Sequence, residues 1–332
     1  MMAGERVARL VISLGPAMVV VLPRAVTNRA TEAIEIHARM AEDGGWSRDR
    51  LDAVVGQPLR LRLTSDDVVH GFAIGRSDFE PLEVEPGRMT EATVTFGQPG
   101  TYTYYCTRWC GVDHWRMRGT IEVSGPDSAT TRTSARPLYE LLGLDIDADH
   151  SSAVVPLRRP SAERGEAISV TIPDAFQTPE YHRTHSPVEK WRALRAAPET
   201  ERLSDQEIWD LVARLWEHAV TPAAIERGAS LYAANCSACH GESGAGDGVM
   251  APIVAQRAQA RSGPDAPGPA DFTDPVRMLG AAPALLQGKI IRGGMGTGMP
   301  NWGPILTEAE TWALVDYLFG FQFSNRRARP PR

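Results

Sequence analysis

Cysteine is scarce in this chain. Its 332 residues include only four cysteines, arranged as two close pairs, Cys106 with Cys110 and Cys236 with Cys239. No cysteine is left over to form a structural disulfide, which excludes a disulfide-rich scaffold. An excess of positive charge is also missing, because 35 lysine and arginine residues stand against 41 aspartate and glutamate residues, for a net charge of -6. That balance argues against nucleic acid as a partner.

Long hydrophobic runs are absent as well. Residues 10–23 are almost wholly apolar, but this run is shorter than the ~20 residues of a membrane-spanning helix. Basic residues flank the run, as in a signal peptide, yet no small-residue cleavage site follows it and Gly15-Pro16 would kink a helix. Residues 1–25 are therefore predicted to be a signal peptide or an N-terminal membrane anchor. In either case the rest of the chain is exported, to the periplasm or the outer face of the cell membrane.

Catalytic motifs are lacking too. The sequence contains no evident Ser-His-Asp set and no paired carboxylates in a catalytic context. The glycine-rich stretch at 293–298 has neither the lysine nor the strand-to-helix context of a phosphate-binding loop. The sequence therefore predicts no catalytic site of its own.

Potential metal ligands, by contrast, are concentrated in one short segment. Cys106, Cys110, His114 and Met117 follow one another with three, three and two residues between them. Thiolate, imidazole and thioether groups together suit copper held for electron transfer. A mononuclear site of this kind needs one cysteine, so the second thiolate indicates two bridged copper ions. His70 lies upstream and is the candidate for a further ligand.

Two plainer interpretations of the first cysteine pair stay open. In an exported protein Cys106 and Cys110 could form a disulfide, or they could be the Cys-x3-Cys of a copper chaperone. A chaperone, however, needs neither His114 nor Met117 at these offsets. The dinuclear copper site is the prediction that uses all four residues.

The surrounding sequence has the pattern of an all-β domain, placed at residues 30–124. Short runs in which apolar and polar residues alternate predict half-buried strands. The predicted strands cover residues 31–40, 57–64, 68–74, 90–96, 100–105 and 119–123. The fourth and fifth runs are expected to form a hairpin that turns at 97–100, and the six strands to form an antiparallel Greek-key sandwich. His37 is predicted to lie on its surface.

The composition changes after the last predicted strand. Residues 124–137 are rich in Ser, Thr, Gly, Ala and Pro, which predicts a linker, and we place a linker and helical segment at 125–220. His182 and His185 in this segment could chelate a metal, but so bare a pair is expected to be solvated loop.

An internal repeat links this segment to the end of the chain. Residues 203–216 align without gaps to residues 306–319, and each stretch begins with a capping box that fixes a helix start. Either 140–217 is a cytochrome-like remnant without its haem, or it is a helical lid that packs on the next domain. The lid is the preferred interpretation.

The second cysteine pair belongs to Cys236-Ser-Ala-Cys239-His240, the attachment signature of c-type haem. In such a motif both thiols add to the haem vinyl groups, and the histidine becomes the proximal iron ligand. A predicted helix at 222–235 leads into the motif. The cytochrome domain is placed at 221–323, ahead of a basic tail at 324–332.

A methionine downstream is expected as the sixth iron ligand, because Met/His ligation raises the haem potential into the range of electron carriers. The options are Met250, Met278, Met295 and Met299. Met299-Pro300 lies just before the last predicted helix and resembles the Met-Pro that small class I cytochromes c carry in this place. This resemblance favours Met299, and Met295 is the second choice.

Residues 30–124 resemble the CuA cupredoxin domain of cytochrome oxidase subunit II and nitrous oxide reductase. The family pattern is one upstream histidine followed by Cys-x3-Cys-x3-His-x2-Met, and this chain matches it at His70, Cys106, Cys110, His114 and Met117. The resemblance implies that Cys106 and Cys110 bridge both copper ions. It also implies that His70 and Met117 complete one copper.

The same resemblance assigns the second copper to His114 and the backbone carbonyl of Arg108. Oxidase subunits usually carry glutamate where Arg108 stands, and that glutamate helps to hold a magnesium ion. A magnesium site is therefore not expected here.

Residues 222–322 resemble the small class I cytochromes c, so the whole chain resembles subunit II of a haem-copper oxidase with a fused cytochrome c. The resemblance implies electron transfer between a haem c and a CuA centre. It also implies two partners, a catalytic membrane subunit and a soluble or membrane-bound electron donor. Three alternatives stay open, namely a freestanding exported shuttle, the corresponding subunit of a nitric oxide reductase, and a copper-handling protein.

Overall fold

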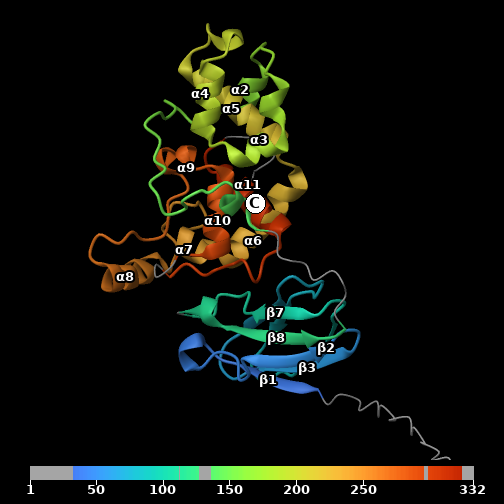
Figure 1. Cartoon of the computed structure of the whole chain (residues 1–332). Helices are drawn as coiled ribbons and strands as arrows, with labels where there is room; N and C mark the ends of the chain where they lie inside the picture. Colours follow the sequence, from blue (N-terminus) through green and yellow to red (C-terminus); the bar gives the residue numbers. More distant parts are fainter. Residues whose placement is uncertain (1–32, 112, 127–135, 295–297, 324–332) are drawn as a thin grey trace, which may run out of the picture. The chain divides into compact units, whose positions relative to one another are not determined.

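The computed structural model describes residues 33–111, 113–126, 136–294 and 298–323. Strands fill the part coloured blue to green in Figure 1, and helices fill the part coloured green to red. The predicted order of an all-β region followed by an all-α region is thereby confirmed. The N-terminal segment 1–25, the tail 324–332 and most of the predicted linker lie outside the described residues. Among the described residues, no helix is long and apolar enough to cross a membrane.

Two sheets make up the β region. Its strands are β1 (Ile34–Ala38), β2 (Arg50–Val54), β3 (Pro58–Ser65), β4 (His70–Ile74), β5 (Leu82–Val84), β6 (Thr90–Thr95), β7 (Gly100–Tyr105) and β8 (Arg118–Ser124). One sheet has the order β1-β3-β6 and the other the order β2-β8-β7-β4-β5. The pairs β1–β3 and β2–β8 are parallel and the remaining pairs are antiparallel. The expectation of a purely antiparallel sandwich is therefore corrected at two edge strands.

The predicted hairpin between residues 90–96 and 100–105 is wrong. β6 pairs with β3 in one sheet, whereas β7 pairs with β4 and β8 in the other. The chain thus crosses between the sheets at 97–100. Phe96 is buried there, and its ring centroid lies 4.5 Å from that of Tyr102. A turn signal alone does not tell whether two strands pair or whether the chain passes to the opposite sheet.

Aromatic side chains form the centre of the β core. Trp46, Phe72 and Tyr104 are all buried, with the Trp46 ring centroid 5.5 Å from Phe72 and 6.0 Å from Tyr104. The Tyr104 hydroxyl donates a hydrogen bond to the Arg48 carbonyl. The Trp46 ring also lies 6.3 Å from the ring of His70. This aromatic cluster therefore forms a rigid wall behind one of the predicted ligands.

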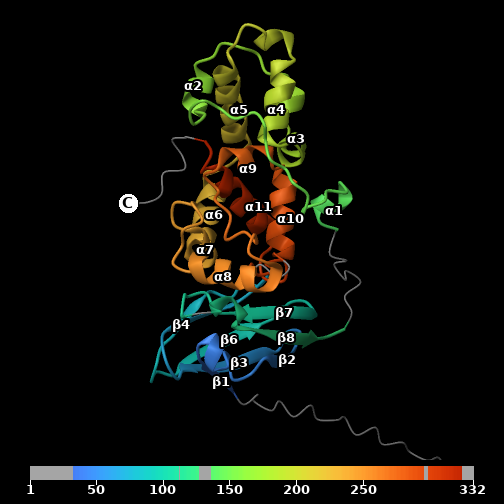
Figure 2. The same cartoon turned by 90° about the vertical axis from the view of Figure 1, so that its left-hand side faces the viewer.

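The α region consists of short and medium helices. They are α1 (Leu138–Leu141), α2 (Ala162–Glu166), α3 (Pro179–Thr184), α4 (Pro187–Arg195), α5 (Asp205–Ala219), α6 (Pro222–Asn235), α7 (Ser237–His240), α8 (Ala251–Ser262), α9 (Pro275–Gly280), α10 (Pro283–Arg292) and α11 (Glu308–Phe319). α6 begins and ends as predicted, and it packs closely on α11 (Figure 2). A Cβ at Gly228 of α6 would lie 2.2 Å from the Ala313 carbonyl oxygen of α11, so the crossing requires glycine.

The internal repeat has a structural counterpart. α5 and α11 both start with a complete capping box, formed by Ser204 with Glu207 and by Thr307 with Glu310. Both predicted helix starts are thereby confirmed. The buried faces of the two helices belong to one hydrophobic cluster that extends from residue 146 to residue 323. The segment before α6 thus shares its core with the helices that follow it.

His182 is not the solvated residue that the sequence predicts. It is buried in α3, and its Nε2 lies 3.4 Å from Oδ1 of Asp316 in α11. The Nζ of Lys190, from α4, lies 3.1 Å from the His182 carbonyl oxygen and 3.4 Å from its Nδ1. In the described part of the chain, neither His182 nor His185 belongs to a group of three potential metal ligands.

Candidate metal centres

Three strands of one sheet converge on the predicted copper site. His70 is the first residue of β4, Cys106 follows β7, and Met117 precedes β8. The Cys106 amide donates to the Met117 carbonyl over 3.1 Å, which closes the base of the loop between β7 and β8. Inside the loop Gly111 has a φ of 140°, and a Cβ there would lie 2.9 Å from the Met40 sulfur. The glycine directly after Cys110 is thus required by the fold of this loop.

The two sulfur atoms of the loop are placed for a shared metal. Cys106 Sγ and Cys110 Sγ are 3.9 Å apart and both side chains are buried. A disulfide would bring the sulfurs to ~2.05 Å. Two thiolates on one metal ion, at bonds of ~2.3 Å and a near-tetrahedral angle, stand ~3.8 Å apart. The observed separation fits the shared metal and not the disulfide.

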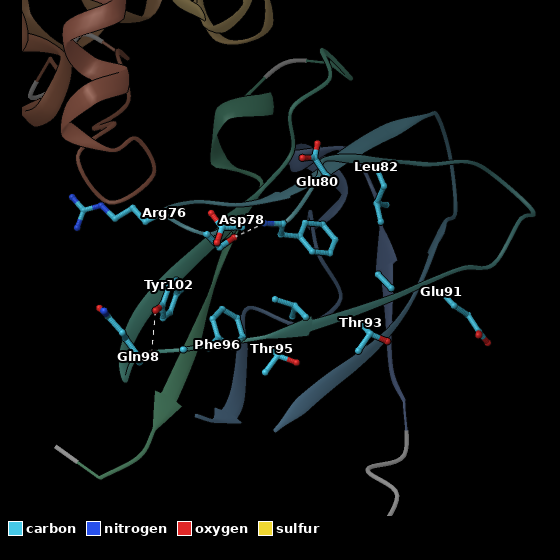
Figure 3. A pocket seen from close by; sticks show the side chains of 15 residues that line it. Arg76, Asp78, Glu80, Leu82, Glu91, Thr93, Thr95, Phe96, Gln98 and Tyr102 are labelled. Atoms are coloured by element: carbon cyan, nitrogen blue, oxygen red, sulfur yellow. Dashed lines mark hydrogen bonds between the residues drawn. The ribbon is translucent and has the colours of Figure 1, made fainter. Parts of the chain in front are cut away.

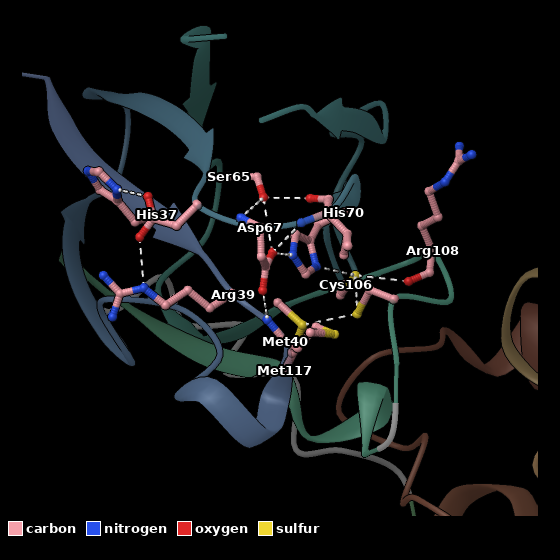
Figure 4. Close-up of polar contacts among 12 residues, drawn as sticks. His37, Arg39, Met40, Ser65, Asp67, His70, Cys106, Arg108 and Met117 are labelled. Atoms are coloured by element: carbon pink, nitrogen blue, oxygen red, sulfur yellow. Dashed lines mark hydrogen bonds and ion pairs between the residues drawn. The ribbon is translucent and has the colours of Figure 1, made fainter. Parts of the chain in front are cut away.

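The other predicted ligands surround this sulfur pair, as Figure 4 shows in part. His70 Nδ1 is 3.9 Å from Cys106 Sγ, and His114 Nδ1 is 3.5 Å from Cys110 Sγ. Met117 Sδ lies 3.3 Å from Cys110 Sγ. The structure therefore brings two thiols, two imidazole nitrogens and a thioether into one cluster.

Arg108 contributes its backbone and not its side chain to this cluster. Its carbonyl oxygen lies 3.2 Å from Cys106 Sγ (Figure 4). Its guanidinium instead forms an exposed ion pair with Glu83. The geometry thus places the Arg108 carbonyl, and not its side chain, beside the sulfur pair.

Asp67 is a site residue that the sequence reasoning missed. Its Oδ1 lies 2.7 Å from His70 Nε2, and its Oδ2 accepts the Met40 amide over 2.6 Å (Figure 4). Because Nε2–H donates to the carboxylate, the Nδ1 lone pair of His70 is left to face Cys106. Burial lowers the pKa of His70, but hydrogen bonds to Cys106 and Asp67 outweigh it and raise this pKa above its usual value. A carboxylate three residues before a predicted ligand was the available signal.

The electrostatics of the pair favour one thiolate. A hydrogen bond from the Cys110 thiol lowers the pKa of Cys106, and the nearby imidazoles of His114 and His70 lower it further. The same hydrogen bond, together with burial, raises the pKa of Cys110. Since the thiolate is the form that binds metals, Cys106 presents a ready ligand for a soft ion.

The predicted haem attachment motif forms the turn between α6 and the end of α7. His240 Nδ1 lies 3.0 Å from the Ala270 carbonyl oxygen, and its ring stacks on Phe272 at 4.6 Å. Burial lowers the pKa of His240, which favours the neutral ring. With Nδ1–H donated to the carbonyl, Nε2 keeps a free lone pair, as an iron ligand requires. Burial also raises the pKa of Cys236 to about 12, so this thiol is protonated.

Met299 lies on a loop that is tied back onto α10. The Gly294 amide donates to the Met299 carbonyl over 3.1 Å, and the Trp302 amide donates to the Ile290 carbonyl over 3.1 Å. Met299 is half-buried and packs against the helical core. Met250 and Met278 are buried in the helical region, whereas Met295 lies outside the described residues.

A separate pocket lies in the β region (Figure 3). Its volume is about 680 Å³, and its lining includes Arg76, Asp78, Phe96 and Tyr102. None of the predicted copper or haem ligands lines it. This pocket is therefore not part of either metal site.

Each of the two regions matches a known protein family. Residues 45–124 match the family described as the periplasmic domain of cytochrome c oxidase subunit II. Residues 225–320 match the cytochrome c family. Both predicted resemblances are confirmed. The chain joins a subunit II-type periplasmic domain to a cytochrome c-type domain.

Individual relatives agree with the first match. Cytochrome c oxidase subunit 2 of Thermus thermophilus is 34% identical over 79 residues, which are 24% of this chain and 58% of that protein. The chain spans about half the length of the curated relatives it matches. Among solved structures, a heme-copper terminal oxidase chain is 28% identical, with a TM-score of 0.26, over 29% of this chain and 67% of its own. The periplasmic domain of subunit II from Bradyrhizobium japonicum is 20% identical, with a TM-score of 0.23, over 28% of this chain and 84% of its own.

Proposed function

We propose that this chain is the electron-transfer subunit II of an exported haem-copper terminal oxidase of the cytochrome c oxidase type. In this role it passes electrons between a c-type haem and a dinuclear CuA centre. The observation that carries the proposal is the pair of buried thiols 3.9 Å apart, ringed by two imidazole nitrogens, a thioether and a carbonyl oxygen. Sulfur and nitrogen donors in this combination suit copper and not a hard, oxygen-preferring ion.

In the proposed copper centre Cys106 and Cys110 would hold both ions. His70 and Met117 would complete one ion, and His114 and the Arg108 carbonyl would complete the other. The bound copper pair would supply the uptake and release of a single electron. The protein's own part is to keep these ligands fixed: Asp67 orients His70, and the buried aromatic cluster excludes water from one side. A rigid ligand set suits electron transfer because little has to rearrange when the charge changes.

In the proposed haem site Cys236 and Cys239 would form the covalent thioether links, and His240 and Met299 would hold the iron. The neutral thiol of Cys236 and the oriented ring of His240 support these roles. A haem held by both residues would carry electrons and would bind no substrate itself. The catalytic membrane subunit of the complex is therefore the proposed electron acceptor or donor on one side, and a soluble or membrane-bound carrier is the partner on the other.

Metal analysis combined with electron paramagnetic resonance tests the proposal. The oxidised exported portion is expected to contain two copper atoms per iron, with one unpaired electron shared over both coppers. A copper-free protein with a Cys106–Cys110 disulfide would contradict it. Co-purification with a many-helix membrane subunit is expected for the oxidase role, and isolation of the loaded chain without any such subunit would instead support a freestanding shuttle.

The Met299→Ala variant tests the axial ligand. Loss of the thioether should leave the haem covalently attached but lower its reduction potential, on the order of 100 mV, because axial ligands set haem potentials over several hundred millivolts. Spectroelectrochemical titration measures the shift. Met250→Ala is the matched control and should leave the potential unchanged. An unchanged potential in Met299→Ala would indicate that Met295, and not Met299, is the iron ligand.

A further inference from the structure

One arginine connects the two candidate centres. Arg118 follows the proposed copper ligand Met117 directly and opens β8. Its Nη1 donates to the Asn301 carbonyl over 2.9 Å and to the Asn301 side-chain oxygen over 3.1 Å. Its Cζ lies 5.2 Å from the ring centroid of Trp302, within the range of a cation–π contact. A single side chain thus extends from the copper loop to the loop that carries Met299.

The surroundings of Arg118 are unusual for a guanidinium. Among the described residues, no carboxylate forms an ion pair with it, and its buried Nη2 atom has no hydrogen-bond partner. A partly buried cation without a counter-ion is costly, so a surface arginine would ordinarily turn toward water. Its acceptors here are the carbonyl, amide and indole of one short loop.

That loop is itself held firmly. Trp302 is 6% exposed, and its amide donates to the Ile290 carbonyl of α10. Gly293 has a φ of 76°, and a Cβ there would lie 2.6 Å from Pro300, so the return of the chain leaves no room for a side chain. Asn301 is separated from Met299 only by Pro300. The contact of Arg118 with Asn301 therefore ends two residues along the chain from the proposed haem ligand.

We propose that Arg118 is the positioning residue through which the copper centre and the haem centre exchange electrons, by way of its contact with Asn301 and Trp302. The inference rests on the proposed function. The electron route runs along the chain from Met117 to Arg118 and crosses one hydrogen bond from Arg118 to Asn301. It then follows the chain through Pro300 to Met299. In the exchange one centre loses one electron and the other gains it, and no covalent bond or proton changes at Arg118. Electronic coupling decays more slowly through covalent and hydrogen bonds than across a gap, which gives this bridge its function.

Further contacts join the β region to the helical region. The Arg76 guanidinium donates to the Gly303 carbonyl, and the Arg257 guanidinium pairs with Asp113 of the copper loop. A Cβ at Gly75 would lie 2.7 Å from Ile305, so the backbones approach closely at this point. These contacts hold Arg118 against its loop, but none of them links a residue next to a copper ligand with the haem-ligand loop.

The test compares Arg118→Met with the parent chain, both fully loaded with copper and haem. After photoreduction of one centre, the rate constant of electron transfer to the other is expected to fall by about tenfold or more in the variant, as expected for a displaced reacting pair. The spectra and potentials of both centres should stay unchanged. Arg118→Lys keeps the charge but not the forked donor geometry and should also be slower than the parent.

A second readout does not depend on loaded metals. Amide hydrogen exchange in residues 298–306 of the full chain is expected to be faster in Arg118→Met than in the parent. Arg88→Met, which removes an exposed arginine paired with Glu85, is the matched control and should change neither readout. An unchanged rate constant or unchanged exchange in Arg118→Met would overturn the inference. A parent chain that does not load both metals would contradict the proposed function instead.

Discussion

The Cys110→Ser protein is expected to lose the mixed-valence copper signal completely. Cys110 Sγ lies 3.9 Å from Cys106 Sγ, 3.5 Å from His114 Nδ1 and 3.3 Å from Met117 Sδ, so it lies close to three of the proposed ligands. A serine oxygen is a harder and far more weakly acidic donor than a thiol, and it does not replace a bridging thiolate on a soft metal. Electron paramagnetic resonance with copper analysis measures the loss.

The control for this experiment is Thr107→Ser, in the same loop. This change removes one methyl group and keeps both thiols, so the parent signal should remain. The Cys110→Ser chain should also retain its covalent haem, because the second cysteine pair is untouched. A mixed-valence signal that remains in Cys110→Ser would contradict the assignment of a dinuclear copper centre.

The Lys190→Met protein is expected to lose a strong dependence of stability on pH. Lys190 is 4% exposed, and burial lowers its pKa from 10.5 to about 7 despite the nearby charges of Asp316 and Glu189. Its closest partner is His182, whose own pKa is lowered by burial and by the Lys190 charge. The buried site thus disfavours the simultaneous protonation of Lys190 and His182.

The direction of the effect follows from proton binding in the two states. Between pH 7 and about 10.5 the unfolded chain holds a proton on Lys190 that the folded chain releases, so the parent becomes more stable as the pH rises. Below about pH 7 both states are protonated and the destabilisation is greatest. One pKa unit corresponds to ~1.4 kcal/mol, so this contribution amounts to a few kcal/mol. Methionine keeps the length of the side chain without the charge and should flatten the dependence.

Guanidinium unfolding of the full chain at pH 7, 8 and 9.5, followed by helical circular dichroism, measures this slope. Lys289→Met is the matched control, because Lys289 is only half-buried and should contribute a smaller part of the slope. A slope in Lys190→Met equal to that of the parent would contradict the buried charge as its cause.

The sequence by itself determined the chemistry of both candidate sites. Five of the six proposed copper ligands lie between Cys106 and Met117, and three of the proposed haem-binding residues lie between Cys236 and His240. Such short motifs can be recognised in the sequence because the metal or haem imposes their spacing. The capping boxes at Ser204 and Thr307 can also be recognised, because a cap acts within one helical turn.

The tertiary structure decided whatever depends on distant parts of the chain. The crossing between sheets at 97–100 follows from the partners of β6 and β7, which no local turn signal specifies. Burial of His182 depends on α11, more than a hundred residues away. Asp67 acquires its role only when β4 brings His70 beside Cys106. The contact of Arg118 with Asn301 likewise joins two segments that are far apart in the sequence, because long-range packing, and not local pattern, selects which surfaces meet.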